Sequence, residues 1–197
     1  MNVALGLKAH SGWAALVIVG RQQGALVVFG RRRVALVDEA WARQPYHAAE
    51  HLAPEPARAL VTRAIDTTRR LAVDEIRAVI AQEHAQKRVV KACAVLVGTA
   101  MPAWTVDEIL AVHFRMHKAE GVLFRDALAR AASECGVRLI AIPEQQLNAH
   151  AVRTLATPLV RLTRQIAALG KSVGPPWGKD QKDAALAALV ALEGRVR

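Results

Sequence analysis

Residues 3–39 read VALGLKAHSGWAALVIVGRQQGALVVFGRRRVALVDE, and this stretch decides the fold. Its apolar residues form three short runs, which are Val3 to Leu7, Trp13 to Val19 and Ala25 to Phe29. Nearly continuous apolar runs of this length are typical of strands that are buried on both faces. Glycine-containing segments separate the runs and indicate tight turns. The stretch therefore predicts a meander of three strands.

The third strand is interrupted by Gly30 and by Arg31, Arg32 and Arg33, before apolar residues resume at Val34. The pattern fits either one bent strand with a bulge or two strands around a tight turn. The three arginines form a basic cluster, and guanidinium groups bind phosphates through two parallel hydrogen bonds. They are candidate nucleic-acid contacts, although a solvated turn that carries charge explains them as well.

Helices and strands alternate after the meander. Two further runs, Val89 to Val97 and Val137 to Ile142, have the apolar character of buried strands. The predicted helices are Ala57 to Gln86, Thr105 to Cys135 with a break near Gly121, Glu144 to Ala156, Thr157 to Gly170 and Gln181 to Glu193, and Asp38 to Pro56 is expected to be a surface loop. This order predicts an α/β fold with a mixed sheet, in one domain over residues 1–197.

The composition of the 197-residue chain is that of a globular protein, with 53% apolar and 22% charged residues. The net charge of +10 favours polyanionic partners, of which nucleic acid is the common one, although an arginine-rich composition alone gives the same charge. The two cysteines, Cys93 and Cys135, are expected in the core. We find no signal-peptide pattern and no apolar run of about 18 residues, so we expect a cytoplasmic protein without a membrane partner.

Three segments carry a resemblance to a known family. Val3-Ala4-Leu5-Gly6-Leu7-Lys8 looks like an opening strand in which an aspartate follows a Leu-Gly-Ile-type run. His117 to Cys135, running into Val137 to Ile142, is similar to a helix-then-strand segment, and Gly178 to Asp183 to a glycine-rich turn that begins a last helix. Together they resemble the ribonuclease H-like superfamily, and within it the RuvC-type Holliday junction resolvases. The resemblance implies a mixed five-stranded sheet, with a three-strand antiparallel meander plus two parallel strands, flanked by helices.

The resemblance also implies a nuclease site, and the sequence departs from it. Two-metal nucleases need several carboxylates that converge on paired cations such as Mg²⁺ or Mn²⁺. Here Lys8 stands in place of the first aspartate, and Gly98 and Thr99 follow the strand where another acid is expected. Asp180 and Asp183 remain at matching positions. The leading hypothesis is therefore a nucleic-acid-associated protein that has lost the two-metal site and needs no metal cofactor.

Two alternatives remain open. The first is an active phosphoesterase of resolvase type with a rearranged site, in which Glu120, Asp180 and Asp183 are catalytic and hold Mg²⁺ or Mn²⁺. The second is a non-catalytic protein-interaction module, because a fold does not by itself determine a function. A homodimer is also left open.

Histidines and carboxylates suggest a metal site as well. His113, His117 and Glu120 are spaced four and then three residues apart, so they share one face of a continuous helix. Imidazole and carboxylate groups at this spacing bind metals or simply form a solvated polar face. The candidate metal ligands are His117, Glu120 and Asp183.

Two other pairs have simpler explanations. His47 and His51 have the same four-residue spacing, but they lie in a segment flanked by prolines, where we expect coincidence. Asp180 and Asp183 fit the start of a helix, with Asp180 as the N-cap and Asp183 in the first turn, where the helix dipole favours a negative charge.

Further candidate contacts to nucleic acid surround Lys8. In the predicted fold Lys8 and the last helix meet at the carboxyl end of the parallel strands, where ligands of open α/β sheets bind. Lys8 with Lys179 and Lys182 would bind a phosphate of DNA or RNA, or Lys8 would form a structural ion pair. Trp177 would stack on a base or cover the edge of the core.

Overall fold

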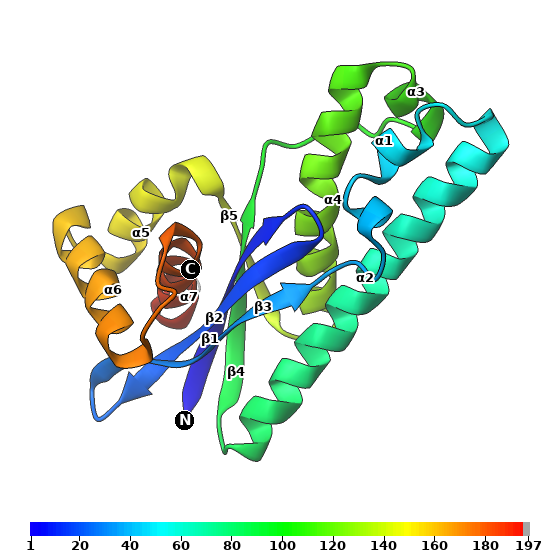
Figure 1. Ribbon diagram of the computed structural model, residues 1–197. Helices are drawn as coiled ribbons and strands as arrows, with labels where there is room; N and C mark the ends of the chain where they lie inside the picture. Colours follow the sequence, from blue (N-terminus) through cyan, green and yellow to red (C-terminus); the bar gives the residue numbers. More distant parts are fainter. Residues whose placement is uncertain (195–197) are drawn as a thin grey trace.

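The computed structural model describes residues 1–194, and its centre is a twisted sheet of five strands (Figure 1). The strands are β1 Asn2–His10, β2 Trp13–Gln22, β3 Ala25–Ala35, β4 Val89–Val97 and β5 Arg138–Pro143. Their order is β3-β2-β1-β4-β5, with antiparallel pairing from β1 to β3 and parallel pairing of β1 with β4 and of β4 with β5. The predicted mixed sheet is therefore confirmed.

Helices cover both faces of the sheet. They are α1 Pro45–Ala49, α2 Pro54–Ala85, α3 Val106–Leu110, α4 His113–Glu134, α5 Leu147–Leu155, α6 Leu159–Val173 and α7 Lys179–Glu193, with short 3-10 helices η1 Ala40–Arg43 and η2 Glu144–Gln146. One core joins α2 and α4 to the sheet, and a second joins α5, α6 and α7 to its opposite face (Figure 1). None of the helices within residues 1–194 is long and apolar enough to cross a membrane.

The third strand is continuous, so the bulge interpretation holds. Ile18 pairs with Gly30 and Val19 pairs with Val28, which leaves Phe29 as the extra residue of a bulge. The arginines at 31–33 consequently lie inside β3 and not at the tip of a turn.

Several predicted helix boundaries were wrong, and tertiary packing explains the differences. The break falls at Val112 instead of Gly121, because buried residues on both sides of Gly121 hold α4 against the core. The presumed loop at 38–56 contains η1 and α1, which bury Tyr46. The last helix begins at Lys179, and Gly178 is its N-cap. The backbone N–H of Gly178 donates a hydrogen bond to the side-chain oxygen of Gln181. Asp180 therefore lies in the first turn and is not the N-cap.

Helix α7 lies directly on β1. A Cβ atom on Gly6 would stand 1.9 Å from the carbonyl oxygen of Ala184, so only glycine permits this approach. Every residue from 184 to 191 is buried, and most of them are alanines. Small side chains thus let the helix backbone approach the strand, which fixes the first turn of α7 at the carboxyl end of β1.

We predict that Gly6→Ala destabilises the protein by about 3 kcal/mol or more, because the new methyl group overlaps backbone that cannot move without displacing α7. Gly121→Ala is the matched control. The nearest atom to its added methyl group is Arg125 Nη1 at 3.8 Å, and alanine in the middle of a helix should stabilise by roughly 0.5–1 kcal/mol. Urea unfolding of both variants measures the difference, and equal stabilities would contradict the packing described for α7.

Candidate functional site

The side chain of Lys8 is surrounded by three carboxylates. Its Nζ lies 2.7 Å from Asp183 Oδ2, 3.1 Å from Glu144 Oε1 and 3.2 Å from Asp180 Oδ1. Lys8 comes from β1, Asp180 and Asp183 from the start of α7, and Glu144 from η2, directly after β5. Lys8 is only 5% exposed. We refer to these four residues as the Lys8 cluster.

Other basic side chains lie around the same carboxylates. Arg125 Nη2 lies 3.0 Å from Glu144, and Lys179 Nζ lies 2.5 Å from Asp183. His10 Nε2 is 3.1 Å from Asp180 Oδ2, although without the angles of a hydrogen bond. Three carboxylates therefore face three permanent cations, Lys8 among them, and the cluster is electrically balanced without any added ion.

The cluster keeps Lys8 charged. Burial by itself would lower the pKa of Lys8, but the hydrogen bonds with Asp183 and Glu144 outweigh it, and the net shift is upward. Burial likewise opposes ionisation of Glu144, but the hydrogen bond and charge of Lys8 prevail and lower the pKa of this carboxyl below its usual 4.5. A permanent ammonium group thus stands where the carboxylates converge.

This donor set does not fit a pair of divalent cations. Such a pair needs carboxylate oxygens that are free to point at the ions, and the same oxygens here point at an ammonium group. Gly98 and Thr99, which follow β4, provide no acid and line a groove of about 790 Å³ beside Glu144 and Lys179.

Sequence reasoning found Lys8, Asp180 and Asp183 but missed Glu144. The signal was available, because Glu144 directly follows a parallel strand and such positions face the ligand-binding edge of an α/β sheet. Glu120, the third member of the candidate catalytic set, does not contact Lys8. Its carboxylate instead lies 2.9 Å from His47 Nδ1.

The candidate metal set of His117, Glu120 and Asp183 is not assembled. Within residues 1–194, the only group of three potential ligand side chains whose donor atoms lie within 4.8 Å of one another is His47, His113 and His117. Asp183 belongs to the Lys8 cluster. His51 is not part of this group, so the four-residue spacing of His47 and His51 is a coincidence as expected. His47 was not predicted to join His113 and His117, and it does so because α1 carries its ring to α4.

Two candidate nucleic-acid contacts have structural partners. Arg31 donates hydrogen bonds to three backbone carbonyl groups within residues 173–176. The indole Nε1 of Trp177 donates to the Ile166 carbonyl oxygen at 2.9 Å, and its ring packs on Gly170. Both side chains thus hold the connection between α6 and α7 in place. Helix α6 ends at Val173 and not at Gly170 as predicted, and Gly170 leaves room for the indole ring.

The remaining basic residues are exposed but differ in their partners. Arg32 lies 3.3 Å from Glu75, and the exposed Arg33 places its guanidinium group 4.0 Å from the centre of the Trp13 ring. Lys179 and Lys182 are both exposed on the first turn of α7.

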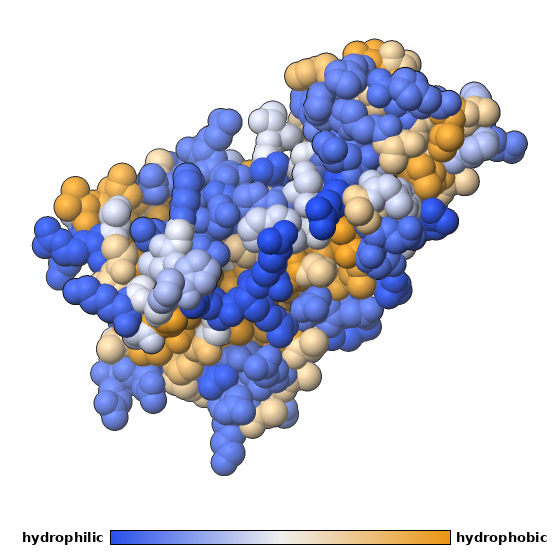
Figure 2. All heavy atoms as spheres, viewed as in Figure 1, coloured by the Kyte–Doolittle hydropathy of each residue, from blue (hydrophilic) through white to orange (hydrophobic). Residues whose placement is uncertain are grey.

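Arg33 lies in the same row of the sheet as Lys8. Lys8 pairs with Ala15 on β2, and Ala15 pairs with Arg33 on β3. A groove of about 400 Å³, lined by Trp13, Arg31, Arg32, Arg33, Pro176 and Gln181, runs along this part of the sheet. A second groove of about 480 Å³ shares Trp13 and Arg33 and includes the exposed Arg43. In Figure 2, strongly hydrophilic residues lie across the middle of the view, with hydrophobic residues between them.

We predict that Lys8→Met destabilises the protein by about 3 kcal/mol at pH 7, because it leaves three carboxylates facing one another with their central cation removed. Lys179→Met is the control. Lys179 also contacts Asp183, but its side chain is 78% exposed, so the loss should stay below about 1 kcal/mol.

The difference between wild type and Lys8→Met should also depend on pH. The lowered pKa of Glu144 contributes stability that is present above its usual 4.5 and is lost as the pH falls through the lowered value. The raised pKa of Lys8 contributes stability that is complete below its usual 10.5. Urea unfolding at pH 7 and pH 3 should show a smaller difference at pH 3, and a constant difference would contradict this account.

Comparisons with known proteins return structures but no sequence family. No protein-family model matches the chain, and neither does any curated protein sequence. The structure of Thermus thermophilus RuvC is similar at 14% identity, with 95% of this chain and 92% of that chain covered and a TM-score of 0.47. T. thermophilus RuvC in complex with a Holliday junction substrate is similar at 13% identity, with 96% and 92% covered and the same TM-score.

A member of the Ppx/GppA protein family from Aquifex aeolicus is also similar, at 14% identity, with 76% of this chain and 37% of that chain covered and a TM-score of 0.35. Identities this low concern the fold alone. The order and directions of the five strands match those expected from the resemblance described above. The chain therefore has the mixed five-stranded α/β fold that the resemblance implied.

Proposed function

We propose that this protein, as one ribonuclease H-like domain over residues 1–197, binds nucleic acid without cleaving it by a two-metal mechanism. The observation that carries the proposal is the position of Lys8 Nζ, which lies within 3.2 Å of three carboxylates at the carboxyl end of β1. The ammonium group takes the role of a metal ion in balancing these carboxylates. It has no exchangeable coordination position, so it cannot activate water as a metal ion does.

The charge distribution supports binding to a polyanion. The net charge is +10, while the acids near the site are already paired with cations in and around the Lys8 cluster. Arg33 and Arg43 line adjoining grooves beside that cluster, and Lys182 is exposed on α7. Phosphate groups bound along these grooves would meet the guanidinium groups of Arg33 and Arg43.

The proposed binding surface includes only some of the nucleic-acid contacts that were expected from the sequence. Arg33, Lys179 and Lys182 keep exposed side chains and remain proposed contacts, and Arg43 joins them. Arg32 shares its charge with Glu75 and contributes less. Lys8, Arg31 and Trp177 act through protein partners and position the surface instead of touching the ligand.

Binding is tested by fluorescence anisotropy with labelled single-stranded DNA, duplex DNA, RNA and a four-way DNA junction. We expect saturable binding at 50 mM salt that weakens steeply by 200 mM, because bound phosphates release counterions. Arg33→Ala and Arg43→Ala should each weaken binding and each reduce the slope of log K against log salt by about 1.

Lys91→Ala is the control for this measurement, because it removes the same charge from an exposed residue near the amino end of β4, away from the grooves. Its binding should equal that of the wild type. If no substrate binds at 50 mM salt, the proposal fails and a protein-interaction module is the better account. If Lys91→Ala weakens binding as much as Arg33→Ala does, the proposed surface is wrong.

Cleavage is tested on the same substrates with Mg²⁺ and with Mn²⁺. We expect the substrates to remain intact with the wild-type protein and with Asp183→Asn alike, because the carboxylates of the Lys8 cluster are held by cations of the protein itself. Robust metal-dependent cleavage that Asp183→Asn abolishes would defeat the proposal. It would establish instead a phosphoesterase with a rearranged site.

A further inference from the structure

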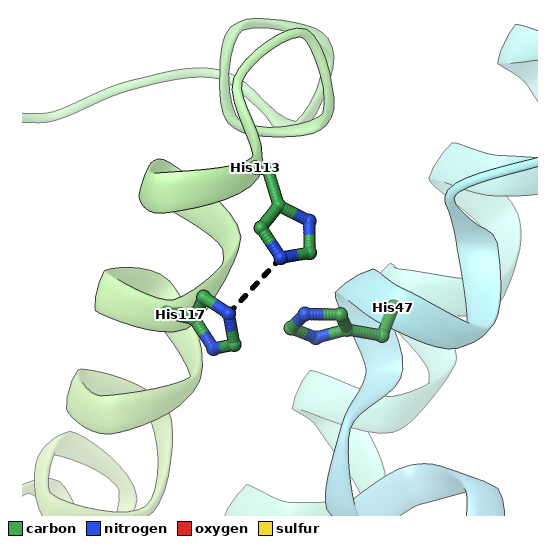
Figure 3. Close-up of side chains that lie close together, drawn as sticks. All are labelled: His47, His113 and His117. Carbon is green, nitrogen blue, oxygen red and sulfur yellow. Dashed lines mark hydrogen bonds between the residues drawn. The ribbon is translucent and has the colours of Figure 1, made fainter.

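Three histidine rings converge between α1 and α4. Figure 3 shows His47 projecting from α1 toward His113 and His117, which lie one turn apart on α4. The ring centres are 4.6 Å apart for His47 and His117, 4.8 Å for His113 and His117, and 5.2 Å for His47 and His113. One ring nitrogen from each residue lies within 4.8 Å of the other two. We call these residues the histidine cluster.

Carboxylates outside the cluster orient two of the three rings. Glu120, only 6% exposed, lies 2.9 Å from His47 Nδ1 with each of its oxygens and also accepts the His47 backbone N–H at 3.3 Å. His113 Nδ1 lies 3.4 Å from Glu50 Oε1. The arrangement is reciprocal, because each helix region supplies a carboxylate that holds a histidine of the other.

These contacts determine which ring atoms are available. An Nδ1–H that donates to a carboxylate leaves Nε2 of the same neutral ring with a free lone pair. His47 and His113 are therefore both set to offer Nε2. The same pairing of a carboxylate with a histidine orients the ligands of many protein metal sites and raises their basicity.

The spacing also suits a metal ion. Nε2 of His113 and Nε2 of His117 are 3.2 Å apart. Two nitrogen ligands that each bind a tetrahedral zinc ion at 2.0–2.1 Å stand about 3.3 Å from one another. The two α4 histidines thus already have the separation of adjacent zinc ligands, and His47 approaches from the opposite helix.

From this geometry we infer that His47, His113 and His117 bind one Zn²⁺ ion, with Glu120 and Glu50 as outer-sphere partners and a fourth coordination position open to solvent. Three neutral imidazoles select zinc or a similar transition metal, whereas Mg²⁺ and Ca²⁺ prefer oxygen ligands. The side chain of His113 is 62% exposed, so the ion and a water molecule can reach the site. The ion would join α1 to α4, and the inference does not depend on nucleic-acid binding.

A simple polar face explains the cluster less well. The Nε2 atoms of His113 and His117 lie within hydrogen-bond distance of one another, so a polar face accounts for this pair. It does not account for His47, which contacts the buried carboxylate of Glu120 through both its backbone N–H and its ring Nδ1. The arrangement holds the third ring against the two on α4.

The test is calorimetric titration of the chelator-treated, full-length protein with ZnCl₂. We expect one ion per chain, and Co²⁺ in its place should produce the visible absorption of tetrahedral nitrogen coordination. His117→Ala should lower the zinc affinity at least about 100-fold and abolish the Co²⁺ spectrum. Glu120→Gln should lower the affinity roughly 10–100-fold by releasing the His47 ring.

His51→Ala is the matched control, because His51 is exposed and lies one turn beyond His47 without joining the cluster. It should bind zinc as the wild type does. His117 is itself exposed on α4, so its truncation should leave the circular dichroism spectrum and the melting temperature of the metal-free protein unchanged. The inference is overturned if saturable binding of one ion is not seen, or if His51→Ala and His117→Ala weaken binding equally.

Discussion

The close approach of α7 to β1 at Gly6 is the constraint on which the site depends. At Gly6 the helix backbone lies so close to the strand that a methyl group would not fit between them, and the buried alanines of α7 continue the contact with the sheet. Because the helix cannot slide without losing these contacts, the first turn of α7 is held at the carboxyl end of β1. Asp180 and Asp183 are thereby brought to Lys8, more than 170 residues away in the chain.

The Lys8 cluster shows that a lysine in place of the expected aspartate changes the chemistry at the carboxyl end of β1 without a change of fold. A carboxylate at this position would leave several negative charges facing one another, which a bound cation or a shared proton would have to neutralise. A lysine supplies the cation from the chain itself. The structure then no longer needs a metal ion for electrostatic balance, and the surrounding Arg125 and Lys179 complete that balance.

The histidine cluster lies in another part of the molecule, between α1 and α4. It joins a short helix, which has few residues to stabilise it, to the first two turns of a long one. Glu120 connects the cluster to the interior, because this buried carboxylate satisfies its charge through His47. A polar contact that appears in isolation to be a simple ion pair thus also determines the orientation of a potential metal ligand.

The sequence alone determined the strands, because apolar runs of strand length separated by glycine report local burial. It also determined that Lys8 stands where the resemblance expects an acid, and that Asp180 and Asp183 begin the last helix region. It could not choose between a bulge and a turn at residues 29–33, because that choice depends on pairing with β2.

Only the tertiary structure decided which side chains meet. Glu144 joins Lys8 because β5 lies beyond β4 in the sheet, and His47 joins His113 and His117 because α1 packs on α4. These residues are separated by 66 or more positions and share no local pattern. Sequence periodicity reports which face of an element is buried, whereas the packing of one element on another determines which polar groups it encounters there.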